Sequence, residues 1–366
     1  MFGFLARGAA VVSMVSGGTA TLAADVTVTL AQPGLDRWVY PFNATPGYRE
    51  VISVFSSLGQ EDSFPPLSFD QRDAQMLLGF DLGASVPGGA GLCGYVVRSA
   101  RLTLVTATDS AFRYDPTYDA YTSYPNGDAD QGRPVELYGA AFRNGWQACA
   151  LGTSVPANNA FPCYYEGTQS MPGPAFGPSI SRGVRHSYPT DYVGGVSAGV
   201  ARDVSNNVRE GFDPQPFAVG QIAGLAAGAL VPVDREMTFT LDVSLAEVQS
   251  FLRAALDSGQ LRLMVTSLQP ASTGGPGPGA GAFATFYAKE IGVPEFAARL
   301  ELIYALAQRG DADVDGRVTF NDITIVLANL GATGGPGLIV PGDVDCNAMV
   351  TFNDVTTVLA NLGAGN

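Results

Sequence analysis

The stretch GDADVDGRVTFNDITIVLANLGA, residues 310–332, decides the fold of the C-terminal end of the chain. Nearly the same string returns 32 residues later as GDVDCNAMVTFNDVTTVLANLGA, residues 342–364. Each copy has an acidic run followed by apolar residues at helical spacing, so each predicts a loop that leads into one short helix. The apolar stripes consist of Ile323, Val326, Leu327 and Leu330 in the first copy and Val355, Val358, Leu359 and Leu362 in the second. Neither helix can bury its stripe alone, so we expect the two copies to pack against each other.

The acidic run of the first copy has the ligand spacing of an EF-hand calcium loop. The expected ligands are the side chains at loop positions one, three, five and twelve and the backbone carbonyl at position seven, namely Asp311, Asp313, Asp315, Asp322 and Arg317. Gly316 at position six permits the tight turn, because glycine tolerates positive φ. Converging carboxylates repel one another unless a cation neutralises them. The pattern therefore predicts a Ca²⁺ site whose loop is much looser without the ion. Thr319 and Asp322 also predict a capping box at the start of the helix.

The second copy repeats this pattern with two changes. Its expected ligands are Asp343, Asp345, Asn347, the carbonyl of Met349, and Asp354. Asn347 stands where the first copy has Asp315, which removes one negative charge. Ala348 replaces the glycine at position six, and a Cβ in a left-handed turn costs about 1 kcal/mol. We therefore expect two calcium sites, of which the second is weaker.

Residues 25–305 form a separate body that is predicted to be mainly β. Only 15% of the residues in the chain are charged, and its 45 glycines and 24 prolines suit many short strands joined by turns. Segments rich in Val, Leu, Phe and Tyr predict strands within residues 26–30, 49–55, 75–82, 95–108, 135–142, 237–244, 261–268, 283–292 and 298–306.

One helix is expected within the body, to cover an open end of the sheets. Ser244 and Glu247 predict a capping box at its start, and Gly259 predicts its end. Residues 149–231 are rich in Gly, Pro, Asn and Ser and predict a long, loop-rich insertion.

The first 24 residues predict an export signal. One early charge precedes a small apolar run and the segment TLAAD, so cleavage is expected near Ala23 or Ala24. No other segment is long and apolar enough for a membrane span. The mature protein is therefore expected to be secreted, extracellular or at the cell surface. The net charge of −14 argues against a nucleic-acid partner and favours cations.

An exported protein can form disulfides. Of the four cysteines, Cys149 and Cys163 flank one loop and are the expected pair. Cys346 lies inside the second acidic run, and we expect no distant partner for it.

The body resembles the DNRLRE family of secreted jelly-roll β-sandwich domains. The matching motifs are Phe80–Leu82, the alternation of Ala100, Leu102 and Leu104, the step Asp242–Ser244, and the closing Ala288–Glu290 with Leu300, Leu302 and Tyr304. This resemblance implies a surface-associated or wall-associated module, usually without known catalysis.

Residues 310–364 resemble a type I dockerin, in which two loop–helix repeats bind calcium. The resemblance implies a calcium-dependent module that binds cohesin domains on a scaffold or cell surface. Dockerins usually carry a Ser-Thr-like pair at loop positions ten and eleven and basic residues later in the helix. This chain has Phe320 and Asn321, Phe352 and Asn353, and Ala328 and Asn329 at these positions. These differences argue against the cohesin specificity familiar from cellulosomes.

The sequence supports three functional hypotheses. The leading one is a non-catalytic binding or surface-assembly protein that attaches through its tail to a cohesin-like domain or another scaffold protein, in a setting that includes polysaccharide. The first alternative is a carbohydrate-active enzyme, a glycoside hydrolase or a polysaccharide lyase, carrying a dockerin. Glu136, Asp191 and Glu210 are candidate acids for it, but no pattern selects a catalytic pair. The second alternative is a purely structural, calcium-stabilised surface protein. His186 is the only histidine, and no catalytic motif surrounds it.

Overall fold

A computed structural model describes the larger part of the chain. The described residues are 25–40, 49–56, 71–123, 131–143, 187–193, 201–271, 283–334, 338 and 340–365, together with three two-residue strands at 13–14, 147–148 and 163–164. The expected signal cleavage, Cys149 of the expected Cys149–Cys163 pair, and His186 lie outside them.

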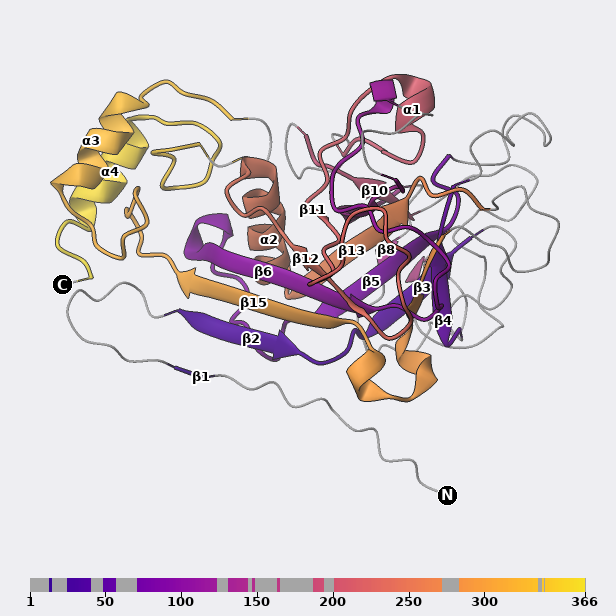
Figure 1. The fold of residues 1–366 in the computed structure, drawn as a ribbon. Helices are drawn as coiled ribbons and strands as arrows, with labels where there is room; N and C mark the ends of the chain where they lie inside the picture. The colour runs from indigo at the N-terminus through magenta and orange to yellow at the C-terminus, as the bar shows by residue number, and fades with distance from the viewer. Residues whose placement is uncertain are drawn as a thin grey trace.

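The body is built mainly from antiparallel β-sheets, as the sequence predicts (Figure 1). A five-stranded sheet has the order β1-β2-β15-β6-β12, with all neighbours antiparallel. Its strands are β1 (Ser13–Met14), β2 (Val26–Leu30), β15 (Arg299–Leu306), β6 (Tyr95–Val105) and β12 (Glu236–Thr240). The last strand, β15, therefore lies between β2 and β6 and brings the end of the body next to its beginning.

The second large sheet has the order β10-β7-β13-β5-β3, and β11 also pairs with β7. Its strands are β10 (Ser187–Thr190), β7 (Val135–Phe142), β13 (Gln260–Ser267), β5 (Gln75–Asp81), β3 (Leu35–Val39) and β11 (Ala218–Val219). Two smaller pairs are β4 (Val51–Val54) with β14 (Ala284–Tyr287), and β8 (Gln147–Ala148) with β9 (Cys163–Tyr164). Every predicted strand segment contains a strand, and β3 is an addition to them.

The two large sheets share one hydrophobic core. Leu300, Leu302 and Tyr304 of β15 enter it from the first sheet, and Leu261 and Leu263 of β13 enter it from the second. Between them, β15 places partly exposed residues, so its alternation follows the period of a strand with one buried face. The alternating pattern thus predicts β15 and the side of it that is buried, whereas β5, β7 and β13 are buried on both faces.

Part of the predicted insertion belongs to the sheet. β10 pairs with β7 along four residues, and Tyr188 and Tyr192 are buried in the common core. Gly139 of β7 makes room for this packing, because a Cβ there would lie 2.5 Å from the Tyr192 ring. The described part of the loop-rich insertion therefore includes two short strands, β10 and β11, that pair with β7 and that its composition does not indicate.

Helix α2 (Ala246–Ser258) contacts β6 of one sheet and β13 of the other, so it covers an end of the body as expected. It ends at Gly259 in a left-handed conformation, with φ of 71°. The predicted capping box is wrong: the N-cap is Leu245, without a side-chain cap. The Ser244 hydroxyl instead donates to Asp242 at 2.5 Å, because a local turn competes for the serine. Among the described residues of the body, the remaining helices are α1 (Asn207–Glu210) and four short 3₁₀ turns.

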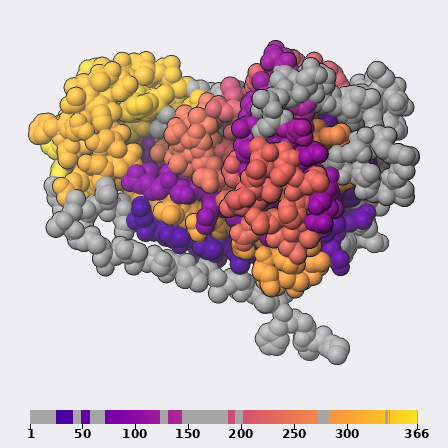
Figure 2. All heavy atoms as spheres, viewed as in Figure 1, coloured from indigo at the N-terminus to yellow at the C-terminus, as the bar shows by residue number. Residues whose placement is uncertain are grey.

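The C-terminal tail contains two helices that lie side by side, α3 (Phe320–Ala328) and α4 (Phe352–Ala360) (Figure 1). In Figure 2 the tail forms a lobe beside the body. Each helix follows its acidic loop, as the repeat predicts.

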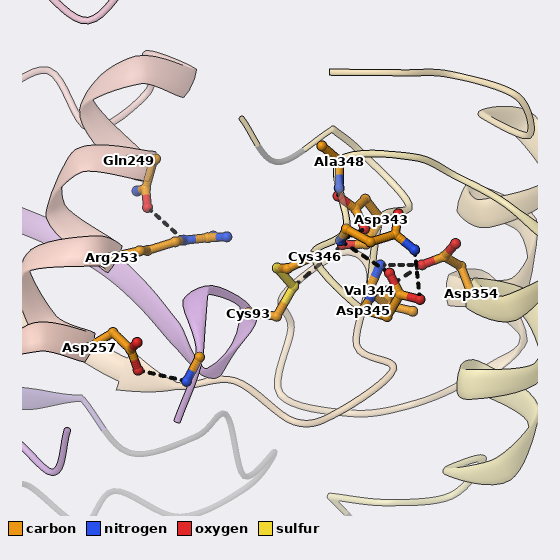
Figure 3. Close-up of a disulfide and its surroundings, with 12 residues drawn as sticks. Cys93, Gln249, Arg253, Asp257, Asp343, Val344, Asp345, Cys346, Ala348 and Asp354 are labelled. Carbon is orange, nitrogen blue, oxygen red and sulfur yellow. Dashed lines mark hydrogen bonds between the residues drawn. A yellow bond between two sulfur atoms is a disulfide. The ribbon is translucent and has the colours of Figure 1, made fainter. Parts of the chain in front are cut away.

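A disulfide between Cys93 and Cys346 joins the tail to the body (Figure 3). Cys93 lies in the 3₁₀ turn Leu92–Gly94 directly before β6, and the two Cα atoms are 5.7 Å apart. A second link comes from Arg98 of β6, whose guanidinium donates to the carbonyl of Val314 at 3.2 Å. The expectation that Cys346 has no distant partner is therefore wrong. Spacing along the chain cannot reveal a contact that the sheet creates between residues 253 positions apart.

Replacing both cysteines, Cys93→Ser with Cys346→Ser, should destabilise the tail by about 2–5 kcal/mol, because the cross-link no longer restrains the unfolded chain. The measurement is urea unfolding of the full chain, with hydrogen exchange to report on α3 and α4. Unchanged protection of both helices in the double variant would contradict the role assigned to this disulfide.

Candidate functional site

The two acidic loops of the tail have nearly the same hydrogen bonds at their junction with the helix. Thr319 caps α3 by accepting from the N–H of Asn321, and its own N–H donates to Asp322 at 2.7 Å. Thr351 and Asp354 form the same capping box at α4, with an N–H to carboxylate distance of 2.8 Å. The predicted capping box of the first copy is thus confirmed, and the second copy repeats it.

The carboxylate at position twelve also holds the beginning of each loop. Asp322 Oδ1 accepts from the N–H groups of Ala312 at 2.6 Å and Asp313 at 3.2 Å. Asp354 Oδ1 accepts from the equivalent residues of the second loop at 2.9 and 3.2 Å. Both aspartates are completely buried. Each one therefore fastens the second and third residues of its loop to the start of a helix.

The carboxylate at position one organises the middle of each loop. Asp311 accepts from the N–H groups of Asp315 at 3.1 Å and Gly316 at 2.8 Å. Asp343 accepts from the N–H groups of Asn347 at 3.1 Å and Ala348 at 2.9 Å. These contacts turn the chain around the first aspartate, so alternate side chains face a common point.

Acidic oxygens cluster in each loop. In the first loop, carboxylate oxygens of Asp311, Asp313 and Asp315 all lie within 4.8 Å of one another. In the second, the same holds for Asp343, Asp345 and Asp354 (Figure 3). These ligand atoms are all oxygens, the type that hard cations such as Ca²⁺ prefer, so the donor set fits calcium.

Both position-one aspartates hold protons more tightly than usual. Burial raises the pKa of Asp311 to about 6, and the carboxylates of Asp322, Asp313 and Asp315 add to the shift. Burial likewise raises the pKa of Asp343 to about 6. Backbone N–H groups oppose both shifts, but burial is the larger effect. A cation placed among these oxygens would relieve both the burial cost and the repulsion.

The remaining predicted ligands keep the geometry of the turn. The carbonyl oxygen of the Asn347 side chain accepts from the N–H of Met349 at 2.9 Å, as Asp315 does from Arg317 at the same distance. The Asn347 amide donates to Asp345 at 3.0 Å. Asparagine thus preserves the turn and supplies a neutral oxygen in place of a charged one.

The backbone of each loop adopts the left-handed conformation at positions four and six. Gly316 has φ of 89° and Ala348 has φ of 66°, as the repeat predicts for position six. Val314 and Cys346 at position four have φ of 60° and 56°. A residue with a Cβ pays a conformational cost there, so the second loop carries strain at position six that glycine avoids in the first.

The two copies pack through a small valine core. Val326 and Val358 of the helices meet Val318 and Val350 of the loops, and all four are buried. The N–H of Val350 donates to Ala332 at 2.9 Å, and the N–H of Val318 donates to Ala364 at 3.0 Å, so each loop also bonds to the segment that follows the helix of the other copy.

Only part of each predicted apolar stripe enters this core. Leu327 and Leu359 are each 51% exposed, and Leu330 and Leu362 are exposed as well. Phe320 and Phe352, at loop position ten, are 73% and 70% exposed. The two copies pack against each other as expected, but two helices of nine residues bury only the side that faces the valines. We call these six residues the apolar face of the tail.

The candidate acids of the body do not form an open carboxylate pair. Glu136 is buried and ion-paired with Arg72, and Asp191 is buried and ion-paired with Arg202. Glu210 ends helix α1 on the surface. These arrangements favour a structural role for the two buried acids.

Ala348→Gly should raise the free energy of unfolding of the tail by up to about 1 kcal/mol, because glycine adopts the left-handed conformation without strain. Gly316→Ala, the matched change in the first loop, should lower it by a similar amount. Chemical unfolding of the full chain monitored by hydrogen exchange of α3 and α4 measures both. Equal effects of the same sign would contradict the strain argument.

The pH dependence should be inverted relative to that of most carboxylates. The pKa of Asp311 and Asp343 is about 6 in the folded chain against an ordinary 3.8, so between these values the folded tail binds more protons than the unfolded chain. In chelator, the free energy of unfolding of the tail should therefore fall as the pH rises from about 4 to about 7. Hydrogen exchange, corrected for its intrinsic pH dependence, measures this trend. Asp311→Asn with Asp343→Asn should remove it, and a persistent trend in that variant would assign it to other groups.

Comparisons with known proteins add nothing to the functional argument, which rests on the residues described above. No protein-family model matches the chain, and a search of curated proteins finds no relative. Among the described residues, no helix has both the length and the apolar character needed to cross a membrane.

Proposed function

We propose that the tail is a dockerin-like module that binds two calcium ions and attaches the protein to a protein partner. The observation that carries this proposal is the duplication of one acidic geometry. Both loops present a cluster of three carboxylates, and both tie the first and twelfth positions to the loop backbone in the same way.

The second site is the weaker one in this proposal. Asn347 supplies less charge than Asp315, and Ala348 strains the backbone that glycine leaves relaxed. The ions would be held by the five predicted ligands of each loop. Calcium would contribute positive charge and six to eight coordination positions, about the number that such a loop and bound water can fill.

The apolar face of the tail supports a docking role. It consists of equivalent residues from the two copies, and exposed aromatic and leucine side chains of this kind are common in protein interfaces. Its phenylalanines occupy the loop position that dockerins use for recognition, which favours a cohesin-like partner with an apolar site.

The body is proposed to be a secreted, non-catalytic jelly-roll domain of the DNRLRE type, at the cell surface in a polysaccharide-associated setting. Its two antiparallel sheets around one core are compatible with that architecture. The ion pairs of Glu136 and Asp191 lend no support to a glycosidase.

The structural alternative is compatible with the way the tail is held. The tail is held to the body by the Cys93–Cys346 disulfide and by Arg98, which suits a calcium-stiffened unit as well as a docking module. The partner experiment below separates these two functions.

Calorimetric titration of the full chain with Ca²⁺ should show two binding events of unequal affinity. Asp311→Asn with Asp315→Asn should abolish the tighter event and leave the other, because two charged ligands are lost from one loop only. Glu295→Gln, which removes the charge of an exposed acid of the body, is the control and should change neither event. No calcium uptake by the unaltered chain would refute the metal assignment.

A pull-down from a cell-surface extract should capture one protein with the full chain in calcium and lose it in chelator. Phe320→Ser with Phe352→Ser should lose the same protein while retaining calcium uptake, because the apolar face is removed and the ligands are not. Capture that survives this double change would place the interface elsewhere. Calcium uptake without any specific capture would favour the structural alternative.

A further inference from the structure

A cavity of about 760 Å³ lies between the body and the tail. Its body side is formed by α2 and by the turn that carries Cys93, and its tail side by the segments that begin the two acidic loops. The Cys93–Cys346 disulfide forms part of its wall. This volume lies within the usual range for small-molecule sites, about 300–1,000 Å³.

Arg253 is the main cationic group on the body side. Figure 3 shows its side chain extending from α2 toward the second acidic loop. Its Nε donates to Gln249 at 3.2 Å, and the Gln249 amide donates to the carbonyl of Val97 at 2.6 Å. Gln249 thus connects the guanidinium of Arg253 to strand β6 and fixes its direction. The two terminal nitrogens of the guanidinium take no part in these hydrogen bonds.

The guanidinium has no carboxylate partner within the described part of the chain. In contrast, Arg72, Arg133 and Arg202 of the body each form an ion pair with an aspartate or glutamate. Burial lowers the pKa of Arg253 to about 10, so it remains charged at neutral pH. A partly buried cation without a counter-ion is costly, and an anionic ligand would relieve that cost.

Two further groups make this side of the cavity suitable for a polar ligand. Ser250 lines the same side, and its buried hydroxyl has no hydrogen-bond partner within the described residues. Arg309, on the segment that leads into the first loop, is exposed and adds a second positive charge.

Acidic residues also border the cavity on the tail side. Asp311 and Asp343 are buried and accept hydrogen bonds from the amides of their own loops. These amides partly offset the charge of the two carboxylates. Asp345 also lines the cavity and is exposed, so the tail side is negative, whereas the cationic groups lie on α2 and next to β15.

We propose that this cavity binds a small organic carboxylate, with the guanidinium of Arg253 as its principal partner. A guanidinium offers two parallel N–H donors that match the two oxygens of a carboxylate. The volume leaves room for a hydroxylated ligand the size of a sugar acid. The argument for Arg253 does not use the proposed calcium sites, but a cation in the loops would reduce the repulsion between a bound carboxylate and Asp311, Asp343 and Asp345.

The test is calorimetric titration of the full, disulfide-bonded chain with sodium glucuronate, sodium acetate and glucose. Both carboxylates should bind and glucose should not. Tighter binding of glucuronate than of acetate would identify an acidic sugar as the ligand, and equal affinities would identify a site for the carboxylate group alone. Absence of binding by both carboxylates, or binding of glucose as strong as that of glucuronate, would overturn the proposal.

Variants locate the site. Arg253→Gln should weaken carboxylate binding about tenfold or more, the usual effect of losing a charged hydrogen bond. Arg253→Lys keeps the charge but not the paired donors, so its affinity for the carboxylate should lie between those of the unaltered chain and of Arg253→Gln. Arg101→Gln is the control, because Arg101 is exposed on β6 and pairs with Glu301 outside the cavity. Thermal unfolding of each variant verifies that it is folded.

Cys93→Ser with Cys346→Ser tests whether both sides of the cavity are needed. It should weaken binding because the tail side is no longer held against α2. Carboxylate binding unaffected by this change and by Arg253→Gln would place the ligand elsewhere and refute the assignment.

Discussion

The antiparallel pairing of β6 with β15 is the interaction on which the arrangement of the whole molecule depends. β15 runs directly into the first acidic loop, and β6 begins directly after the turn that carries Cys93. Their hydrogen bonds therefore bring the start of the tail beside the residues that fasten it. Arg98 and Cys93 can reach the two loops only because this pairing places them at the same end of the sheet.

The sequence predicted those parts of the fold that depend on local patterns. Alternation in β2, β12 and β15 follows the two-residue period of a half-buried strand, so these strands could be located to within a few residues. The loops could be located because ligand geometry requires oxygen-bearing side chains at fixed intervals. The capping box of Thr319 followed from the same local spacing.

The parts that were missed depend on contacts between distant residues. The Cys93–Cys346 pair exists because two segments far apart in the chain meet beside a sheet, and neither cysteine has a neighbouring signal for it. The strands β10 and β11 are too short, and the residues around them too polar, for the sequence pattern to predict them. Ser244 was assigned to a cap because the sequence cannot show that Asp242 binds it first.

The two loops also show how much substitution one geometry tolerates. Asn347 and Ala348 preserve the backbone hydrogen bonds of the first loop although one removes a charge and the other adds a Cβ. The position-twelve aspartates explain this tolerance, since each ties its loop to a helix through several N–H groups. The shape of the loop is held by its ends, and the middle can vary in charge and in strain.

Position four of each loop breaks the equivalence of the two copies. Val314 and Cys346 occupy matching, left-handed positions, and both are contacted by the body, one through a hydrogen bond and the other through a covalent bond. The local geometry of the two copies is alike, but only the copy that carries the cysteine can be cross-linked to the turn before β6. The tail therefore has a fixed polarity: a molecule that approached its apolar face would always meet the same helix nearer to the same side of the body.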